Sequence, residues 1–437
     1  MKEIRVRVVG GGLAGVEAAY HLAQKGVFVD LYEMRPVKST PAHQTDLLGE
    51  LVCSNSLKGT DPLTAHGLLK KEMARLDSVV LKAADETKVP AGKALAVDRD
   101  AFGHALTNIV QSNPFIEIHR QEFVGIEPDI PTIIATGPLT SEALASFLAD
   151  ITGSDRLFFY DAISPIINAE SIDMEHAFFG ARWDPQSTDY LNCPFDKDLY
   201  YAFVDELIKS DRVNPRSFED TRFFDACLPV EIIALRGRES LSFGPMRPVG
   251  FTDPHTGSRP YALLQLRREN LKGDAYNMVG FQTRLTYPEQ KRIFCMIPAL
   301  ARAEFLRFGS IHRNTFFDSP RVLNEDFSIK GYPLVFLAGQ VTGVEGYMES
   351  AATGIMAALA VLAKISGKAF SAPAADTAIG ALINYITDEK NTNFQPMNIN
   401  FGIMEPLDVP KKTRKQARLE KESLSFETWL KSPCVSG

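Results

Sequence analysis

Residues 4–33 read IRVRVVGGGLAGVEAAYHLAQKGVFVDLYE, and this stretch decides the fold. Its alternating apolar residues over 4–9 predict a strand. The apolar spacing of 16–25 predicts a helix that Gly26 ends, and the apolar run 27–32 predicts a second strand. A strand, a helix and a strand in this order form a β-α-β unit, which predicts an α/β fold with a parallel sheet.

Three glycines, Gly10, Gly12 and Gly15, form a G-x-G-x-x-G motif between the first predicted strand and the helix. Gly10 permits a tight turn, Gly12 lets the backbone approach a pyrophosphate, and Gly15 lets the helix pack closely on the strand. Glu33 ends the second strand, where a carboxylate accepts hydrogen bonds from an adenosine ribose. An ordinary strand–helix turn is the alternative, but strand, helix and acid together favour a dinucleotide site. Its expected residues are Gly10, Gly11, Gly12, Leu13, Ala14, Gly15 and Glu33.

Two later strand ends distinguish FAD from NAD. The run LVFLAGQ over 334–340 resembles the late FAD motif of flavoproteins, in which Gly339 and Gln340 follow the strand and the next helix begins near the flavin. Thr136 and Gly137 fit the middle Ala-Thr-Gly strand end that many flavoproteins share. Each run alone also fits an ordinary strand and turn, but the three matches together favour FAD.

The middle of the chain changes character. Residues 180–320 carry more aromatic residues and arginines and less regular strand signals than the segments on either side. We therefore expect a discontinuous Rossmann-type FAD-binding domain over 1–180 and 319–437, with an inserted α+β domain over 181–318. Within the first segment, we expect a long loop over 34–65 and a helix over 67–82.

Composition limits the class of protein. The 437 residues are 45% apolar and 23% charged, as in soluble globular proteins. No apolar run approaches the roughly 20 residues that span a bilayer, and the first nine residues lack the apolar core of a signal peptide, so we expect a cytoplasmic protein. Five cysteines without a Cys-x-x-Cys pair suggest neither a disulfide framework nor a metal site. The net charge of −7 argues weakly against a nucleic-acid partner without excluding one.

Two cysteines lie in polar surroundings. Cys53 lies in LVCSNSL on the loop after the nucleotide unit, and Cys227 lies in FDACLPVE. Lone cysteines are often inert, buried residues, so function and structure remain equal alternatives for both. His312 could stack on a flat ligand or be structural. The arginines of the inserted region could meet phosphates or form an acid-paired face, and residues 411–422 predict a charged helix.

From Val8 to about Gly402, the chain resembles the folate- and FAD-dependent tRNA (uracil-5-)-methyltransferase family, TrmFO, among the GidA-related flavoproteins. The glycine motif alone is common to many flavoproteins, whereas the cysteine blocks and the arginine block are narrow. The most specific matching blocks are ELVCSNSLK, DYLNCPF, FDACLPVE, LRGRESLSFGPMRPVG, AGQVTGVEGYMESAATG and FQPMNINFG.

The resemblance implies a reaction. Methylenetetrahydrofolate supplies a one-carbon unit, FAD carries reducing power, NAD(P)H reduces the flavin, and the acceptor is C5 of the uridine at position 54 in the T loop of tRNA. Such chemistry needs a thiolate, because C5 of uracil becomes nucleophilic only after addition at C6. The same chemistry on ribosomal RNA, an FAD oxidoreductase for a small molecule and a non-catalytic tRNA-binding flavoprotein are the alternatives.

The resemblance also assigns roles by position. Cys53 and Cys227 match the two functional cysteines of the family. We assign Cys227 as the C6 nucleophile and Cys53 as the partner near the flavin, acting in proton removal or in protecting the flavin adduct, and the reverse division stays open. His312 matches the histidine that stacks on the pterin, so the resemblance implies folate binding there.

Overall fold

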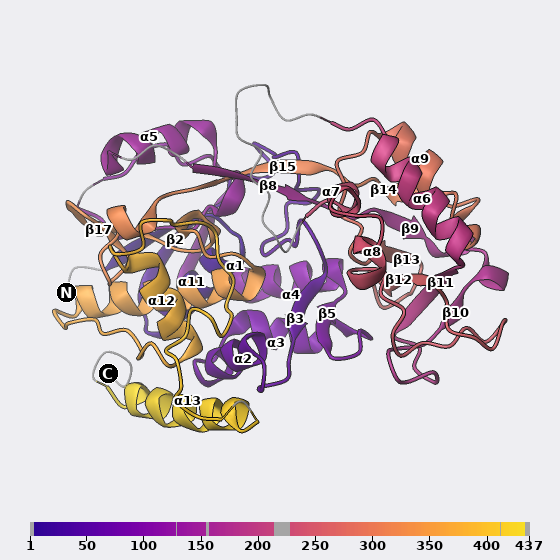
Figure 1. The fold of residues 1–437 in the computed structure, drawn as a ribbon. Coiled ribbons are helices and arrows are strands. Elements are labelled where there is room, and N and C mark those ends of the chain that lie inside the picture. Colours follow the sequence, from indigo (N-terminus) through magenta and orange to yellow (C-terminus); the bar gives the residue numbers. More distant parts are fainter. Residues whose placement is uncertain (1–3, 128, 154–156, 214–227, 411, 433–437) are drawn as a thin grey trace.

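The computed structural model describes residues 4–127, 129–153, 157–213, 228–410 and 412–432 (Figure 1). Its first domain is built on a six-stranded sheet with the order β16-β17-β7-β1-β2-β6, in which every neighbouring pair is parallel except β16 and β17. The α/β fold class is thereby confirmed. The strands are β1 (Arg5–Val9), β2 (Phe28–Tyr32), β6 (Ile116–His119), β7 (Thr132–Ile134), β16 (Ser328–Ile329) and β17 (Tyr332–Leu337).

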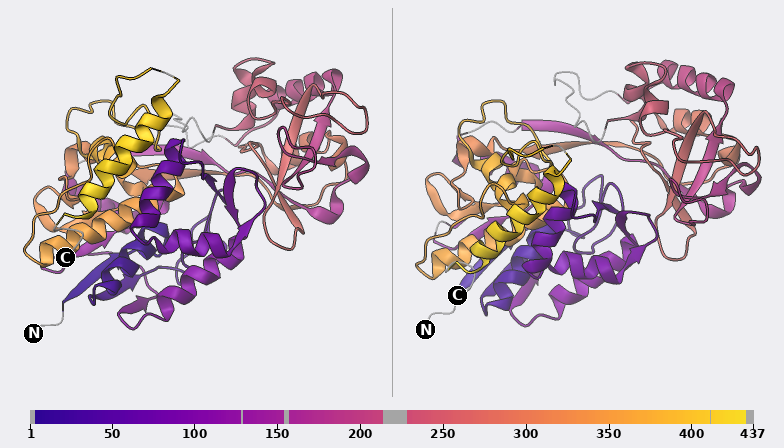
Figure 2. Two further views of the ribbon diagram at one scale, coloured as in Figure 1. Left: turned by 90° about the horizontal axis from the view of Figure 1, so that it is seen from below. Right: turned by 60° about the horizontal axis from the view of Figure 1, so that its bottom comes forward.

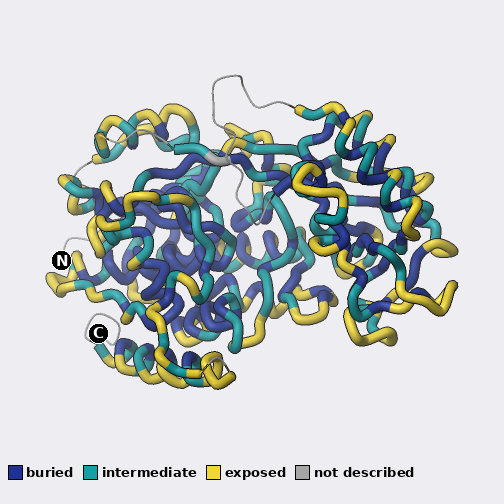
Figure 3. Tube along the Cα trace, viewed as in Figure 1, coloured by how far each residue is buried: buried dark blue, intermediate teal, exposed yellow. Residues whose placement is uncertain are grey.

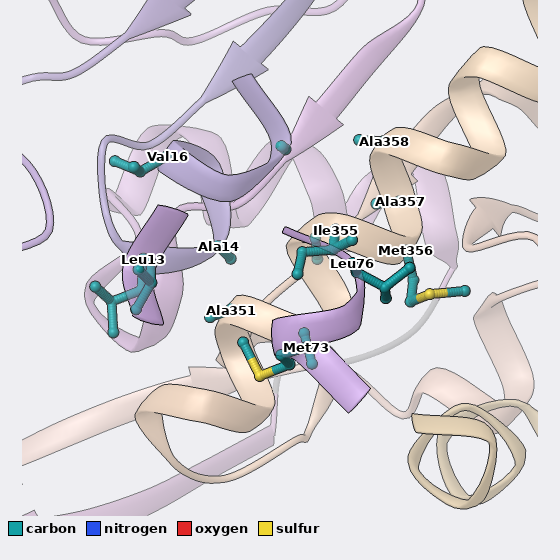
Figure 4. Close-up of a cluster of buried hydrophobic side chains, with 14 of the residues drawn as sticks. Leu13, Ala14, Val16, Met73, Leu76, Ala351, Ile355, Met356, Ala357 and Ala358 are labelled. Carbon is teal, nitrogen blue, oxygen red and sulfur yellow. The ribbon is translucent and has the colours of Figure 1, made fainter. Parts of the chain in front are cut away.

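Two helices pack on each other in the core of this domain, α1 (Leu13–Gln24) and α11 (Tyr347–Ile365). Figure 4 shows the small and branched side chains between them, Ala14 and Ala351 among them. The backbones approach so closely that a Cβ at Gly354 would lie 2.1 Å from the carbonyl oxygen of Ala14. Helix α11 is apolar and long enough to cross a membrane, but most of it is buried here, so we interpret it as a core helix.

The remaining helices of the first domain cover this core. They are α2 (Ala65–Arg75), α3 (Val79–Glu86), α4 (Arg99–Gln111), α5 (Glu142–Thr152), α10 (Ser319–Val322), α12 (Ala378–Thr387) and α13 (Arg414–Leu430). The tube of Figure 3 shows the buried segments gathered around α1 and α11. Helix α13 carries the expected charged segment and lies along the outside of the domain, beside α2 (Figures 1 and 2).

Two local expectations were wrong. The helix expected over 67–82 is two helices, because Asp77 adopts a left-handed conformation with φ 66° and the Ser78 side chain then caps α3 by accepting a hydrogen bond from Leu81 N. The loop expected over 34–65 contains a strand, β3 (Ser56–Gly59). This strand joins a small sheet in the order β3-β5-β4, with β4 (Lys88–Val89) and β5 (Ala94–Val97).

A second domain is reached through one pair of antiparallel strands, β8 (Leu157–Ala162) and β15 (Ile311–Phe316). Figures 1 and 2 show this pair bridging two lobes. Strand β9 precedes residue 181 but belongs to the second sheet. We therefore propose that the inserted domain begins after β8 and ends before β15, rather than at residues 181 and 318.

The inserted domain is an antiparallel sheet in the order β10-β11-β12-β13-β9-β14, covered by short helices. Its strands are β9 (Ile166–Asn168), β10 (Phe178–Phe179), β11 (Tyr190–Phe195), β12 (Ala262–Arg268), β13 (Ala275–Met278) and β14 (Phe305–Arg307). Its helices are α6 (Lys197–Lys209), α7 (Val230–Leu235), α8 (Ser240–Phe243) and α9 (Tyr287–Phe294). A separate apolar core that includes Phe203, Phe281 and Phe294 holds it together.

Candidate functional site

Two glycines where β1 turns into α1, Gly10 and Gly15, could not be replaced without movement of the neighbouring backbone. Gly10 has φ 107°, and a Cβ there would lie 2.5 Å from the carbonyl oxygen of Ala135 on the neighbouring strand. A Cβ at Gly15 would lie 1.8 Å from the carbonyl oxygen of Gly10. Gly15 therefore fixes the distance between helix and strand, as the sequence motif predicts.

Gly12 differs from its neighbours because its missing side chain leaves open space. A Cβ at Gly12 would meet no atom within 4 Å, and Gly12 lines a large cavity beside the turn. It is also the N-cap of α1, which has no side-chain cap. The first amides of a twelve-residue helix thus face a cavity with room for a phosphate group.

Glu33 is buried at the end of β2, beside the same cavity. Its carboxylate accepts hydrogen bonds from Gly11 N at 3.0 Å and from Arg35 Nε at 2.9 Å. Burial alone would raise the pKa of Glu33, but the hydrogen bonds and charge of Arg35 outweigh it and lower that pKa. Glu33 is therefore a fixed carboxylate at the position where an adenosine ribose would lie.

Arg35 was missed by the sequence reasoning. Its guanidinium lies between Glu33 and Glu50, at 2.9 Å and 2.8 Å, and is buried. It also donates to the carbonyl oxygen of Thr45 at 3.2 Å. Arg35 therefore links the loop after β2 to the carboxylate of the cofactor site. In the sequence, only its position two residues after Glu33 could have indicated this role.

The cavity collects most of the predicted cofactor residues from four chain segments. Thr136 and Gly137 lie at the start of a 3-10 helix, η1 (Gly137–Leu139), and Gly339 and Gln340 lie at the start of another, η6 (Gln340–Thr342). Gly15 lies behind the turn and does not line the cavity. The predicted residues that do line it are Gly10, Gly11, Gly12, Leu13, Ala14, Glu33, Thr136, Gly137, Gly339 and Gln340.

A second cavity lies directly beside the first and is lined by both Cys53 and His312. It forms between the first domain and the start of the inserted domain, since Ile163 and Gln282 also line it. The residues that line both cavities, and so form the wall between them, are Val52, Pro138, Leu139, Gln340 and Tyr347. A ligand in one cavity would therefore lie close to a ligand in the other.

Cys53 is half-buried and held through its backbone. Its amide donates to the phenolic oxygen of Tyr347 at 2.8 Å, and its sulfur lies 3.8 Å from the carbonyl oxygen of Ala162. Arg99 also reaches this loop, because its Nη2 donates to the carbonyl oxygen of Cys53 at 3.4 Å.

His312 lies on β15, opposite Asp161 of β8. Its Nε2 lies 3.0 Å from the Ser310 hydroxyl. Burial, and then the charge of Arg307, lower the pKa of His312 to about 4. Its imidazole is therefore neutral at physiological pH and suited to stacking on a flat, uncharged ring.

Charged residues gather at the other end of the second cavity, and the sequence reasoning did not single them out. Burial would raise the pKa of Glu349, but Lys58 at 3.5 Å and His66 at 3.4 Å lower it to about 2. Glu345 shows the opposite shift, because burial and the charge of Asp161 raise its pKa well above the usual value. Burial lowers the pKa of Lys70 to about 8. Glu349, beside Lys58, and Glu345, near Asp161, thus line the same cavity with pKa values shifted in opposite directions.

Cys227 lies outside the described residues. Of the other cysteines, Cys193 is fully buried on β11, and burial raises the pKa of its thiol to about 12. Cys295 is half-buried at the end of α9, where burial also raises the pKa of its thiol. Within the described part of the chain, Cys53 is thus the cysteine that lines a cavity beside the cofactor residues.

One cluster of potential metal ligands occurs among the described residues. Asp30, Glu117 and His119 place ligand atoms within 4.8 Å of one another, at the edge of the first sheet. The guanidinium of Arg5 already pairs with Asp30 at 2.5 Å. An arginine in that position repels a cation, so the cluster does not fit a metal site.

The fold, the glycine turn and the cavity beside it define a Rossmann-type dinucleotide-binding protein. Residues 5–369 match the family described as Glucose inhibited division protein A, and the chain belongs to the TrmFO group of this GidA-related flavoprotein family. Two crystal forms of Aquifex aeolicus GidA share the fold, with TM-scores of 0.73 and 0.70 at 16% identity. The first match spans 100% of this chain and 74% of the GidA chain, and the second spans 99% and 78%.

Relatives of much higher identity carry the name methylenetetrahydrofolate–tRNA-(uracil-5-)-methyltransferase TrmFO. The protein of Desulfotalea psychrophila is 50% identical over 97% of each chain. That of Anaeromyxobacter dehalogenans is 51% identical over 99% of this chain and 97% of its own. That of Natranaerobius thermophilus is 49% identical over 98% of this chain and 99% of its own. The resemblance found in the sequence is therefore confirmed along nearly the whole chain.

Proposed function

We propose that this protein is a methylenetetrahydrofolate–tRNA (uracil-5-)-methyltransferase that uses FAD and methylates C5 of uridine 54 in the T loop of tRNA. The relatives that share about half of its residues are named methylenetetrahydrofolate–tRNA-(uracil-5-)-methyltransferase, and the T-loop position is added by the proposal. NAD(P)H is the proposed source of electrons, and the cytoplasm, where tRNA is modified, is the proposed location.

One structural observation carries the proposal: the cavity that contains Cys53 and His312 shares a wall with the cavity of the dinucleotide motif. A folate and an FAD bound side by side need this arrangement, because the one-carbon unit must lie near the flavin when it is reduced. His312 is neutral and half-buried, which suits contact with a pterin ring. A small-molecule oxidoreductase would not require a cysteine in a cavity next to that of the cofactor.

The residues of the first cavity fit FAD. The open space over Gly12 and the free amides of α1 suit the pyrophosphate, and the fixed carboxylate of Glu33 suits the ribose. Gly339 has φ 79° and lies against Ala14, so the chain passes close to the turn without a side chain in the way. When bound, FAD supplies the two electrons that turn a transferred methylene group into a methyl group, and NAD(P)H restores them.

The cysteines divide the chemistry at the uracil. The Cys227 thiolate adds its electron pair to C6, which places the negative charge on C5, C4 and O4 and lets C5 attack the methylene carbon. Cys53 accepts the proton that C5 then loses, and the electron pair of that C–H bond expels the folate amine from the methylene carbon. A hydride, which a reduced flavin bound in the first cavity would supply, makes this carbon a methyl group, and the Cys227 thiolate leaves C6 to restore the ring. The Tyr347 hydroxyl accepts from the Cys53 amide, and the Arg99 guanidinium donates to the Cys53 carbonyl oxygen, so both hold the backbone that carries the sulfur.

The test uses the purified yellow protein with an unmodified tRNA transcript, methylenetetrahydrofolate and NADPH. The digested RNA is analysed for 5-methyluridine, and a transcript with cytidine in place of the T-loop uridine is the control. Product in the first transcript alone supports both reaction and position. NADPH consumption without product, in the presence of bound flavin, would favour ribosomal RNA as the acceptor or a small-molecule oxidoreductase.

Variants then test the nucleophile. Cys227→Ala is expected to abolish methyl transfer while FAD stays bound, and Cys295→Ala is the matched control because its half-buried thiol lines neither cavity. An active Cys227→Ala protein would reject this residue as the nucleophile. In that case Cys53→Ala should be the inactive variant, which would reverse the division of roles.

A further inference from the structure

A patch on the inserted domain combines exposed aromatic rings with arginines. Phe243 at the end of α8 is 77% exposed, and it lines a shallow pocket together with Arg247 and Arg259. Trp183 is 76% exposed and packs with Arg182 over Gly250, which follows the pocket residue Val249. We call these five residues, Arg182, Trp183, Phe243, Arg247 and Arg259, the aromatic–arginine patch.

The arginines of this patch differ from several other arginines of the domain, which have acidic partners. Arg238 pairs with Asp205, Arg292 with Glu206 and Glu289, and the Arg284 guanidinium lies 3.9 Å from Glu231. Within the described residues, by contrast, the guanidiniums of Arg182, Arg247 and Arg259 have neither a carboxylate partner nor a hydrogen bond. Three exposed guanidiniums without counter-charges, next to exposed rings, can together contact a ligand that carries both negative charges and flat rings.

The floor of the pocket is rigid. The carboxylate of Glu239 accepts hydrogen bonds from the hydroxyls of Tyr261 at 2.9 Å, of Ser242 at 3.0 Å and of Tyr201. Glu239 is the acidic residue in the pocket wall, and these three hydroxyls already occupy its oxygens. The pocket therefore presents tyrosine and proline surfaces with arginines at its rim, rather than a free carboxylate.

We propose that the aromatic–arginine patch binds a single-stranded segment of RNA. Exposed rings stack on unpaired bases whatever their identity, and arginines at the rim contact the phosphates between them. Phe243 ends α8 and Arg247 follows it, and Figure 1 shows α8 on the side of the inserted domain that faces the first domain. That this RNA is the tRNA substrate rests on the proposed function.

The test measures binding of the FAD-loaded full-length protein to unmodified tRNA transcript by fluorescence anisotropy at several salt concentrations. Phe243→Ala and Trp183→Ala are expected to weaken binding about tenfold each, because each removes one stacking surface. The double variant Arg247→Gln/Arg259→Gln is expected to weaken binding and to reduce the slope of log K against log salt by about 1–1.5. In methyl transfer, all three should raise KM for tRNA more than they lower kcat.

Matched controls come from the same domain. Arg292→Gln removes an exposed arginine that is already paired, and Tyr287→Ala removes a 56% exposed ring that stacks on Phe308. Both should bind tRNA as the unchanged protein does. Flavin absorbance and the melting temperature show whether each variant is folded.

The outcomes separate this inference from the proposed function. If the unchanged protein methylates tRNA and the patch variants bind it within about twofold of the unchanged protein, the patch is not an RNA site and the proposed function stands. If the unchanged protein binds tRNA without forming 5-methyluridine, the proposed function fails while the variants still test the patch. Equal losses in the patch variants and the controls would also reject a specific site.

Discussion

The backbone amide of Cys53 donates a hydrogen bond of 2.8 Å to the phenolic oxygen of Tyr347. The two residues are far apart in the chain, but Tyr347 begins α11 and forms part of the wall between the two cavities. The bond therefore links the loop that carries the candidate catalytic cysteine to the helix whose first turn borders the cofactor site. Any ligand that moves Tyr347 would also move the Cys53 loop.

Tyr347→Phe tests this link. The ring is retained, but the acceptor for the Cys53 amide is lost at a cost of about 1 kcal/mol. Because the effect falls on the position of Cys53, we expect FAD content to stay unchanged and the rate of methyl transfer to fall about tenfold. Flavin absorbance and single-turnover formation of 5-methyluridine measure the two quantities. An unchanged rate would show that the bond does not position Cys53.

Gly12→Val separates the cofactor site from the fold. Because no protein atom lies within 4 Å of a Cβ at Gly12, the variant should fold with little change in stability. The added side chain would instead project into the cavity and exclude the pyrophosphate, so we expect a colourless protein. Gly59→Ala is the matched control, since its Cβ would make only an ordinary contact of 3.7 Å with Lys93 O. A yellow Gly12→Val protein would argue against this nucleotide site.

The sequence was sufficient for the α/β class and for the sheet around the glycine turn, because β1, α1 and β2 are local and each signal lies within thirty residues of the next. It also indicated which glycines form the turn. It could not indicate that Gly15 lies behind the cavity rather than in its wall, because that depends on the packing of α1 against β1. The break at Asp77 was missed because a left-handed residue inside an apolar pattern leaves no periodic signal.

The second cavity was harder to predict, since its residues come from distant segments. Cys53, His312 and Glu349 converge only after the inserted domain returns through β15. Single-residue motifs could name Cys53 and His312, but not the contact with Tyr347 or the ion pair from Lys58 to Glu349. Such partners are fixed by tertiary packing and have no fixed spacing in the chain.

His312 predicts a dependence of stability on pH. Its pKa is about 4 in the folded protein, below the 6.5 of a free histidine, so the unfolded chain binds more protons between these values. The unfolding free energy that depends on a neutral His312 is therefore fully present above about pH 6.5 and is lost as pH falls toward 4. We expect His312→Asn to reduce the loss of unfolding free energy between pH 7 and pH 5 by about 1 kcal/mol. Urea unfolding at both pH values measures it, and the exposed His104→Asn is the control, which should leave the dependence unchanged.

Lys58→Met tests the charged end of the second cavity. Burial would raise the pKa of Glu349, which is 1% exposed, but Lys58 and a hydrogen bond from His66 lower it to about 2, so this carboxyl group is ionised at pH 7. Removal of the ammonium leaves a buried carboxylate with only His66 and the Ile399 amide beside it, which should cost about 1–3 kcal/mol of unfolding free energy. The pKa of Glu349 should rise as well, so the cost should shrink at low pH, where the carboxylate accepts a proton.

Lys330→Met is the matched control for this variant. The two lysine side chains are 34% and 36% exposed, but Lys330 pairs with Glu389, which is 74% exposed. An exposed pair contributes about 0–1 kcal/mol, so the control should unfold nearly as the unchanged protein does. Urea unfolding of both variants at pH 7 gives the comparison. Equal losses of unfolding free energy would show that the pair of Lys58 with the buried Glu349 stabilises the protein no more than an exposed pair does. A larger loss for Lys58→Met would show that the buried carboxylate needs this partner because it cannot reach water.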